Sequence, residues 1–380
     1  MSIMPSVTLG ITSRAKEMAA QGKRICSFAA GEPDFDTPEH IKSAAVRALG
    51  AGETKYTAAG GLPALCSAVA EKLAKENGLF YESGQVVISN GAKHSLFNIF
   101  MALCSAGDEV IIPAPYWLSY PEMVRIAGGN PVVVHCREDN DFKLTPAEFE
   151  SIITDRTRAI IINSPSNPIG LVYTESELKA LADVAVRHDV YIVSDEVYEK
   201  IVYDGQTHVS VGSFSQEIFD RTITVNGFSK AYSMTGWRLG YFAGPSDLVQ
   251  AVCAFQSHST SAPNTFAQYA AVEALRGSQE CVAEMVQAFA ERRACLYERL
   301  VSIEGITCVR PMGAFYMLPN ISVFGIDSVT FAERLLEREG VAVVPGAVFG
   351  VDNNIRISYA CSMDVITEGM DRIEKFIASL

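Results

Sequence analysis

The 380-residue sequence has no run of apolar residues long enough to span a bilayer, and its opening residues, MSIMP, lack the basic and apolar segments of a secretory signal. Its nine cysteines include no C-x-x-C pair, and its six histidines show no metal-ligand spacing such as H-E-x-x-H. Scattered cysteines within apolar stretches are typical of free thiols in a reducing compartment. We therefore expect a soluble, cytoplasmic protein without a structural metal.

Basic side chains are also in the minority. Lysine and arginine total 31 against 44 aspartates and glutamates, which gives a formal net charge of −13. An acidic surface repels nucleic acid and anionic membranes, so binding to either is disfavoured. Apolar residues, in contrast, make up 48% of the chain, which is ample for a large core. At roughly 150 residues per domain, the length predicts two domains, or one large domain with a smaller one attached.

Short runs rich in Val, Ile and Tyr recur through the middle of the chain, and segments with helical patterning separate them. The expected strands are 85–89, 109–112, 131–135, 158–162, 190–194, 222–225 and 239–243. Most are continuously apolar, as in strands buried on both faces. A capping-box pattern, Thr174-Glu175-Ser176-Glu177, begins one of the intervening helices. This alternation predicts an α/β fold with a mostly parallel central sheet between layers of helices.

The C-terminal third has a different pattern. Residues 264–303 are helix-rich, and a small α+β segment follows, with expected strands at 307–310, 313–318, 342–344 and 354–358. We expect this segment to form a small domain together with the N-terminal residues. The predicted division is a large domain of residues 40–285 and a small domain of residues 1–39 plus 286–380.

Polar residues follow several expected strands, at the sheet edge where parallel sheets bind ligands. In chain order they are the turn Asn90-Gly91-Ala92-Lys93, Asn167, Asp195, Tyr198, Lys230 and Arg238, with Arg356 on a later strand. Taken singly, each has an ordinary explanation as a turn, a cap, a core aromatic or a surface charge. Small residues in the first turn would let backbone N–H groups bind an anion at a helix N-terminus. Their occurrence together indicates a ligand site.

This set resembles the pyridoxal-phosphate site of the class I aminotransferases, and the resemblance covers essentially the whole chain. The matching stretches are Ala30-Gly31-Glu32-Pro33-Asp34-Phe35, Lys55-Tyr56-Thr57, Ser164-Pro165-Ser166-Asn167-Pro168-Ile169-Gly170, Ser194-Asp195-Glu196-Val197-Tyr198 and Phe228-Ser229-Lys230-Ala231-Tyr232-Ser233-Met234-Thr235-Gly236-Trp237-Arg238-Leu239-Gly240-Tyr241. It implies the fold-type-I architecture of pyridoxal-phosphate-dependent transferases. It also implies a homodimer with shared active sites, in which Tyr56 reaches the cofactor phosphate of the neighbouring subunit.

The resemblance implies roles for the catalytic residues. Lys230 would hold the aldehyde of pyridoxal 5'-phosphate as a Schiff base and then act as the general base. Asp195 would pair with the pyridine nitrogen and keep it protonated. Tyr198 and Asn167 would hydrogen-bond the phenolic oxygen of the cofactor.

The same resemblance assigns the phosphate to Arg238 and the turn Gly91-Ala92-Lys93, and the ring face to Trp117. One departure concerns Gly227, three residues before the lysine, where many relatives carry a phosphate-binding hydroxyl. Either the phosphate has one donor fewer, or a nearby hydroxyl such as that of Ser229 replaces it.

The substrate residues follow in the same way. Arg356 would bind the α-carboxylate in a bidentate fork, and Gly31, Trp117 and Asn167 would also contact the substrate. One bacterial subgroup binds the distal carboxylate of aspartate with a lysine after the anion turn and with hydroxyls near the N-terminus. Lys93, with Ser6 and Thr8, resembles that pattern.

The leading hypothesis is therefore an enzyme that moves the amino group of aspartate to 2-oxoglutarate by a ping-pong mechanism. An aromatic or prephenate aminotransferase shares every cofactor residue, although the N-terminal arginine common in prephenate-accepting relatives is missing before Pro5. The sequence distinguishes poorly between an aminotransferase and a pyridoxal-phosphate-dependent lyase on the same scaffold. A non-catalytic DNA-binding regulator is opposed by the net charge.

Overall fold

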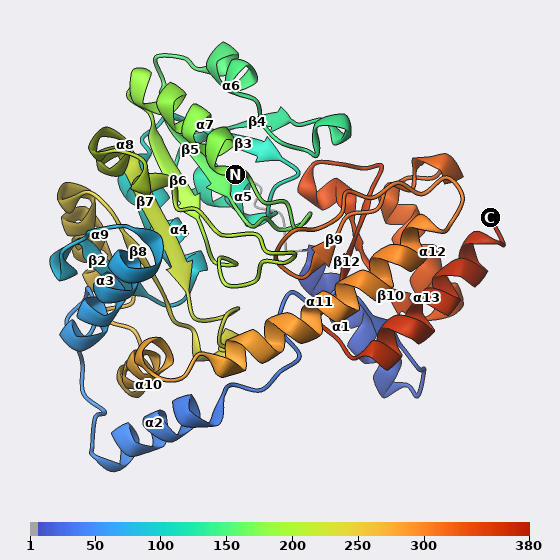
Figure 1. Cartoon of the computed structure of the whole chain (residues 1–380), viewed down its shortest axis with the longest axis horizontal. Helices are drawn as coiled ribbons and strands as arrows, with labels where there is room; N and C mark the ends of the chain where they lie inside the picture. Colours follow the sequence, from blue (N-terminus) through green and yellow to red (C-terminus); the bar gives the residue numbers. More distant parts are fainter. Residues whose placement is uncertain (1–6) are drawn as a thin grey trace.

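A seven-stranded sheet forms the centre of the protein in the computed structural model, which describes residues 7–380 (Figure 1). Its strand order is β2-β8-β7-β6-β5-β3-β4. The strands are β2 (Val86–Ser89), β3 (Glu109–Ala114), β4 (Asn130–His135), β5 (Thr157–Asn163), β6 (Tyr191–Asp195), β7 (Thr222–Gly227) and β8 (Gly240–Ala243). All pairings are parallel except those of β8, which is antiparallel to both neighbours. The predicted α/β sheet is confirmed.

Helices cover both faces of this sheet because its central strands are apolar on both sides. In β5, Ile160 and Ile162 pack into one core and Ala159 and Ile161 into another. One face packs against α4 (Ala92–Leu103), α5 (Ser119–Ile126) and α9 (Ser246–Ser259). The other packs against α3 (Pro63–Asn77), α6 (Pro146–Ile152), α7 (Glu175–Arg187), α8 (Gln216–Arg221) and α10 (Thr265–Arg276), with α2 (Glu39–Gly50) lying on α10. None of the helices in the described part of the chain is long and apolar enough to cross a membrane.

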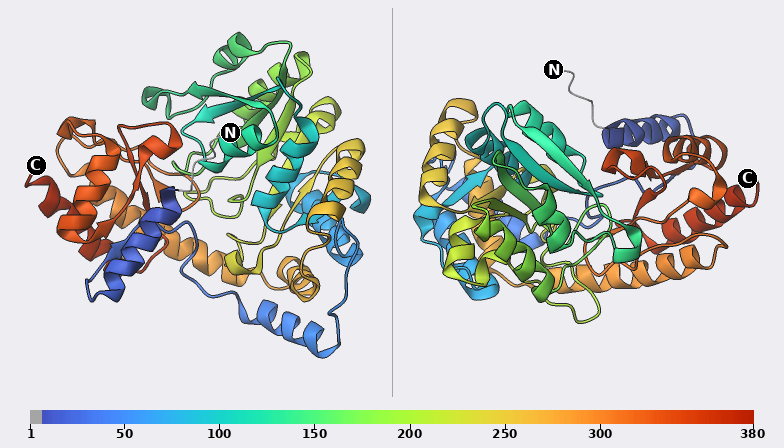
Figure 2. Two further views of the ribbon diagram at one scale, coloured as in Figure 1. Left: turned by 180° about the vertical axis from the view of Figure 1, so that it is seen from behind. Right: turned by 90° about the horizontal axis from the view of Figure 1, so that it is seen from above.

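The C-terminal part contains two small sheets. Strands β9 (Tyr316–Met317), β11 (Val344–Pro345) and β12 (Ile355–Ser358) form an antiparallel sheet in the order β11-β12-β9. Strand β1 (Cys26–Ser27) pairs in parallel with β10 (Val341–Ala342), which attaches the N-terminal region to this part. The helices here are α1 (Val7–Ala20), α12 (Ser328–Glu339) and α13 (Met363–Ile377), and α1 lies beside the C-terminal segments in both views of Figure 2.

One predicted strand, 307–310, is wrong. Thr307 forms only an isolated bridge with Asn320. The backbone beyond it is bound by a side chain, because Arg293 donates a hydrogen bond of 2.7 Å to the carbonyl of Pro311. A charged side chain thus takes the place of a neighbouring strand.

Helix α11 (Glu280–Val301) joins the two parts (Figure 1). Near its start, Val282 packs with the core beside α3 and α10. Further along, Met285 and Phe289 pack into a separate core that contains the C-terminal sheet and Phe28. The predicted domain division at residue 285 lies within this helix, and it stays a prediction.

The topology brings several strand ends to one edge. Because β8 is antiparallel to both β2 and β7, the strands β2, β7, β6 and β5 all end at the same edge of the sheet. The start of α4 lies directly against β8: a Cβ atom on Gly240 would be 2.2 Å from the backbone nitrogen of Ala92 and 2.5 Å from the carbonyl carbon of Gly91. A glycine at this position is therefore required for the turn to reach the edge.

We predict that Gly240→Ala lowers the free energy of unfolding by about 1–3 kcal/mol, the usual cost of overpacking, because the added methyl group meets backbone rather than a flexible side chain. Urea denaturation would measure the loss. Gly84→Ala is the matched control, since a Cβ atom there meets nothing within 4 Å. Equal stabilities of the two variants would contradict the assigned contact.

Candidate active site

A cavity of about 620 Å³ lies at the carboxyl edge of the large sheet, between this edge and the C-terminal part. The side of α1 that carries Ala15 and Ala19 also lines it. The predicted site residues in its lining are Gly31, Ala92, Lys93, Trp117, Asn167, Asp195, Tyr198, Lys230, Arg238 and Arg356. Residues far apart in the sequence are thus brought into one cavity.

The remaining predicted residues lie elsewhere. Gly91 lies against the guanidinium of Arg238. Tyr56 is 92% exposed and is not part of the cavity lining of its own subunit. Ser6 lies outside the described residues, and Thr8 lies on α1 with its side chain likewise outside the description.

Asp195 ends β6 and is buried within the cavity wall. Tyr120 donates a hydrogen bond of 2.6 Å to its Oδ2, and the backbone N–H of Val197 donates one of 3.3 Å to its Oδ1. Burial raises the pKa of Asp195 to about 6, although both hydrogen bonds oppose the rise. A buried carboxylate of this kind is stabilised by a cationic or protonated group that enters the cavity.

Lys230 follows β7, and its Nζ donates a hydrogen bond of 2.5 Å to the carbonyl of Gly31. Burial lowers the pKa of this lysine to about 8. The charges of Arg356 and Arg238 act in the same direction, whereas that of Glu32 opposes them. An amine with a lowered pKa is neutral, and therefore nucleophilic, in a larger fraction of molecules near neutral pH.

Two tyrosines form the wall beside this lysine. The hydroxyls of Tyr198 and Tyr316 are 2.9 Å apart, and both side chains are buried. Burial, and next the proximity of Tyr316, raise the pKa of Tyr198 well above its usual value. Tyr198 is therefore a neutral phenol at physiological pH, and its proton is available for a hydrogen bond.

Arg356 lies on β12, in the C-terminal part, yet it contacts the large sheet. Its Nη1 donates to Oδ1 of Asn167 at 3.1 Å, and its Nη2 donates to the carbonyl of Ala29 at 2.9 Å. The guanidinium lies 4.6 Å from the ring centroid of Tyr316. Its Nε is buried and has no hydrogen-bond partner among the described residues. This arginine thus offers a buried positive charge and a free donor.

The turn before α4 forms a pocket with Arg238. The Nη1 of Arg238 donates to the carbonyl of Thr235 (2.8 Å), and its Nη2 donates to that of Asn90 (3.2 Å). Gly91 has φ +90°, and a Cβ atom on it would lie 2.6 Å from this Nη2. Backbone N–H groups at the start of a helix and an adjacent guanidinium form an anion site.

Little space surrounds Gly227, the position at which the sequence departs from the family pattern. A Cβ atom there would be 3.2 Å from Cα of Gly240 and 3.3 Å from the carbonyl oxygen of Leu239. Ser229 lines the cavity, whereas the hydroxyl of Thr235 is bound to Glu32 at 2.7 Å. Both alternatives stay predictions: the phosphate has one donor fewer, or a hydroxyl such as that of Ser229 replaces the missing one.

Sequence reasoning missed Tyr120 and Tyr316. Tyr120 lies in the first turn of α5, three residues after Trp117, which precedes the helix, and the two ring centroids are 5.3 Å apart. This i, i+3 spacing from a predicted site residue was a usable signal. Tyr316 is on a two-residue strand of the C-terminal sheet, and nothing in its local sequence links it to Tyr198.

The three groups of the cavity fit one cofactor. The carboxylate of Asp195 fits a protonated ring nitrogen, the amine of Lys230 fits an aldehyde, and the anion site at Arg238 fits a phosphate. Pyridoxal 5'-phosphate carries all three. The unpartnered Nε of Arg356 leaves a donor for a further anionic ligand beside them. Fold and cavity together define a pyridoxal-phosphate-dependent enzyme of the α/β type.

Comparison with known proteins specifies the family. Residues 23–373 match the family Aminotransferase class I and II. The chain is 51% identical over 381 residues to the aspartate aminotransferase of Geobacillus stearothermophilus, covering 99% of this chain and 97% of that protein. It is 49% identical to the aspartate/prephenate aminotransferase of Cereibacter sphaeroides, covering 100% and 97%. The aspartate aminotransferase of Thermus thermophilus, solved with maleate, superposes with a TM-score of 0.95 at 45% identity, covering 98% and 97%.

The chain belongs to the class I and II aminotransferases. It is a pyridoxal-phosphate-dependent aminotransferase with the fold of that family, so the expected family, fold and cofactor are confirmed. The roles assigned to single residues stay predictions.

We predict that in the cofactor-free protein an acylating reagent modifies Lys230 with a rate that rises with pH around a midpoint near the pKa of about 8. The sign follows from burial: below this pH the amine is protonated, and above it the folded protein holds the amine neutral. Pulse labelling with peptide mass spectrometry would measure it, and Lys230→Ala identifies the labelled peptide. A midpoint of about 10, the usual lysine range, would contradict the assigned environment.

Proposed function

We propose that this aminotransferase transfers the amino group of aspartate to 2-oxoglutarate. The observation that carries the amino-acid part of this proposal is Arg356, a buried arginine whose Nε has no partner among the described residues and which lines the same cavity as Lys230. A guanidinium in this state binds the α-carboxylate that every amino-acid and 2-oxo-acid substrate carries. The hydrogen bond from Nη1 to Asn167 orients the guanidinium toward the cavity.

The residues of the chain divide the chemistry between them. When bound, the cofactor supplies an aldehyde and an electron-accepting ring, which take up the amino group and stabilise negative charge at the substrate Cα. Lys230 would hold the cofactor through its aldehyde, and its amine would move a proton to and from the substrate Cα, a task for which its lowered pKa suits it. Asp195 would provide the counter-ion of the ring nitrogen, and Tyr198 would donate a hydrogen bond to the ring oxygen.

Lys93 is the proposed binder of the distal carboxylate. It lies in the cavity lining, and its Nζ is 4.8 Å from the ring centroid of Trp117. Burial lowers the pKa of Lys93, and the charge of Arg238 adds to this effect, so an incoming carboxylate relieves an unfavourable environment. The names of the relatives from Geobacillus stearothermophilus and Thermus thermophilus agree with aspartate as substrate. The name of the Cereibacter sphaeroides relative keeps prephenate as an alternative substrate.

We predict that Lys93→Ala lowers kcat/KM for aspartate. The expected loss corresponds to about 2–4 kcal/mol of transition-state stabilisation, within the range for removing one partner of a desolvated charge pair. The value for phenylalanine should change far less, because Arg356 still binds the α-carboxylate. Steady-state assays with 2-oxoglutarate as acceptor measure both, and Lys179→Ala on the exposed face of α7 is the control.

The same assays test the function itself. Release of oxaloacetate from aspartate supports the proposal, and prephenate as acceptor tests the alternative. Elimination products would indicate a lyase and contradict it. Equal losses for aspartate and phenylalanine in Lys93→Ala would assign this lysine to the cofactor phosphate instead.

We further propose a cytoplasmic homodimer with shared active sites. All nine cysteines are free thiols, which suits a reducing compartment. Large apolar side chains are exposed in the single chain, among them Val46 (67%), Tyr56 (92%) and Phe80 (78%). Such side chains are typical of surfaces that a second subunit covers.

A subunit-mixing experiment tests the sharing. Lys230→Ala subunits and Tyr56→Ala subunits should each have low activity at limiting cofactor. If Tyr56 serves the neighbouring site, a hybrid dimer has one fully intact site, and activity should return to about half of wild type. If Tyr56 serves its own site, the hybrid has no intact site and no recovery occurs. Analytical ultracentrifugation would establish the dimer in parallel.

A further inference from the structure

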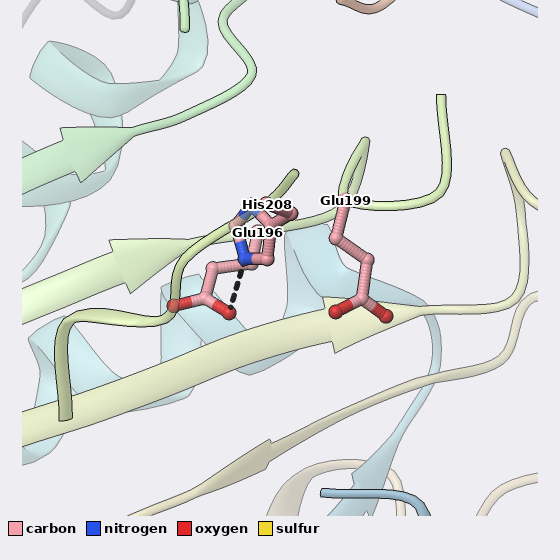
Figure 3. Close-up of side chains that lie close together, drawn as sticks. All are labelled: Glu196, Glu199 and His208. Carbon is pink, nitrogen blue, oxygen red and sulfur yellow. Dashed lines mark hydrogen bonds and ion pairs between the residues drawn. The ribbon is translucent and has the colours of Figure 1, made fainter. Parts of the chain in front are cut away.

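Behind Asp195 lies a buried cluster that takes no part in lining the cavity. The next residue, Glu196, is 1% exposed and accepts hydrogen bonds from Ser194 (2.8 Å) and Ser210 (2.6 Å). The Nε2 atom of His208 is 2.9 Å from Oε2 of Glu196 (Figure 3). Two consecutive carboxylates are thus buried at the end of β6, one facing the cavity and one facing this cluster.

A second carboxylate in the cluster, that of Glu199, is already paired with the ammonium group of a lysine. Lys72 forms a buried salt bridge with it, and Asn77 donates a hydrogen bond of 2.7 Å. Although Glu196, Glu199 and His208 have possible ligand atoms within 4.8 Å of one another, the Lys72 ammonium supplies the positive charge there, so a metal ion is not needed. Among the described residues, His208 is the basic side chain that contacts Glu196, whereas Lys72 contacts Glu199.

His208 is placed to carry that charge. Its side chain is 10% exposed, and its Nδ1 has no partner among the described residues, so the contact with Glu196 orients the ring. Burial lowers the pKa of His208, but the charge of Glu196 and its hydrogen bond, with the charge of Glu199, raise it above the usual value against the opposing charge of Lys72. The geometry and the surrounding charges both favour the imidazolium.

The charge on Glu196 matters to the cavity because its neighbour is Asp195. A negative charge on Glu196 raises the pKa of Asp195, which burial has already raised. The hydroxyls of Ser194 and Ser210 donate hydrogen bonds to Glu196 but bring no positive charge, so without a positive partner nearby the charge of Glu196 acts on Asp195 without compensation.

We propose that His208 is a positioning residue whose positive charge offsets Glu196 and thereby keeps Asp195 ionised toward the ring nitrogen of the cofactor. The role of His208 rests on the proposed function, since that proposal assigns Asp195 to this nitrogen. Two readouts that do not depend on activity test it: the Kd of pyridoxal 5'-phosphate for the cofactor-free protein, and the NMR signal of a ¹⁵N-labelled ring nitrogen.

His208→Asn should raise the Kd at pH 7.5 about tenfold, which corresponds to about 1.4 kcal/mol, and should shift the ring nitrogen toward its unprotonated signal. The double variant Glu196→Gln/His208→Asn should return both readouts close to wild type, because it removes the uncompensated charge. A merely structural role makes the opposite prediction: the double variant would bind as weakly as His208→Asn or more weakly. That result would overturn the proposal.

His188→Asn is the matched control, because this exposed histidine contacts Glu150 on the surface and should change neither readout. If His208→Asn does not fold, histidine NMR of the wild-type holoenzyme decides: a protonated His208 at pH 7.5 supports the proposal, and a neutral one overturns it.

Asp195→Asn distinguishes a failure of the role proposed for His208 from a failure of the role proposed for Asp195. Loss of the ring proton in Asp195→Asn but not in His208→Asn would reject the role of His208 alone. Retention of the ring proton in Asp195→Asn would reject the assigned role of Asp195 and, with it, the role of His208.

Discussion

The buried carboxylate of Asp195 is the constraint on which the arrangement of the site depends, because the groups around it have to compensate its charge. A negative charge at 4% exposure is tolerated only with hydrogen bonds and a nearby positive charge. Tyr120 supplies a hydrogen bond from one side, and His208 offsets the adjacent Glu196 from the other. A ligand with a protonated ring nitrogen would supply further positive charge here, and pairing with such a nitrogen is the role predicted for Asp195.

The parallel sheet makes this arrangement possible. Strand ends meet at one edge, so residues separated by more than a hundred positions in the chain become neighbours there. Close backbone contacts hold the edge together, above all between Gly240 and the turn before α4. The turn before α4 and the start of β8 are therefore held at a set separation by main-chain contacts.

The proposed substrate site lies where the two parts of the chain are in contact. Arg356 comes from β12 in the C-terminal part, and it donates to Asn167 in the turn after β5. Its guanidinium also lies on the ring of Tyr316, whose hydroxyl is hydrogen-bonded to Tyr198. A carboxylate bound by Arg356, the predicted role of this arginine, would be held at the boundary between the parts, in the cavity that Lys230 also lines.

Sequence alone determined the sheet, because continuous Val and Ile runs are stable only when both faces are buried, and it determined which polar residues follow the strands. Lys230, Asp195 and Arg238 could be predicted as site residues because they occur together near strand ends and because the stretches around them resemble those of class I aminotransferases. Tertiary structure decided that residues 307–310 form no strand. It also decided the contacts of Tyr120, Tyr316 and His208, which were not among the predicted site residues. Their contacts join segments whose local sequence carries no mutual signal: Arg293 binds the backbone of Pro311, and the ring of His208 reaches Glu196 through a buried cluster. Burial also sets the pKa values of Asp195 and Lys230, and burial exists only once the chain has folded.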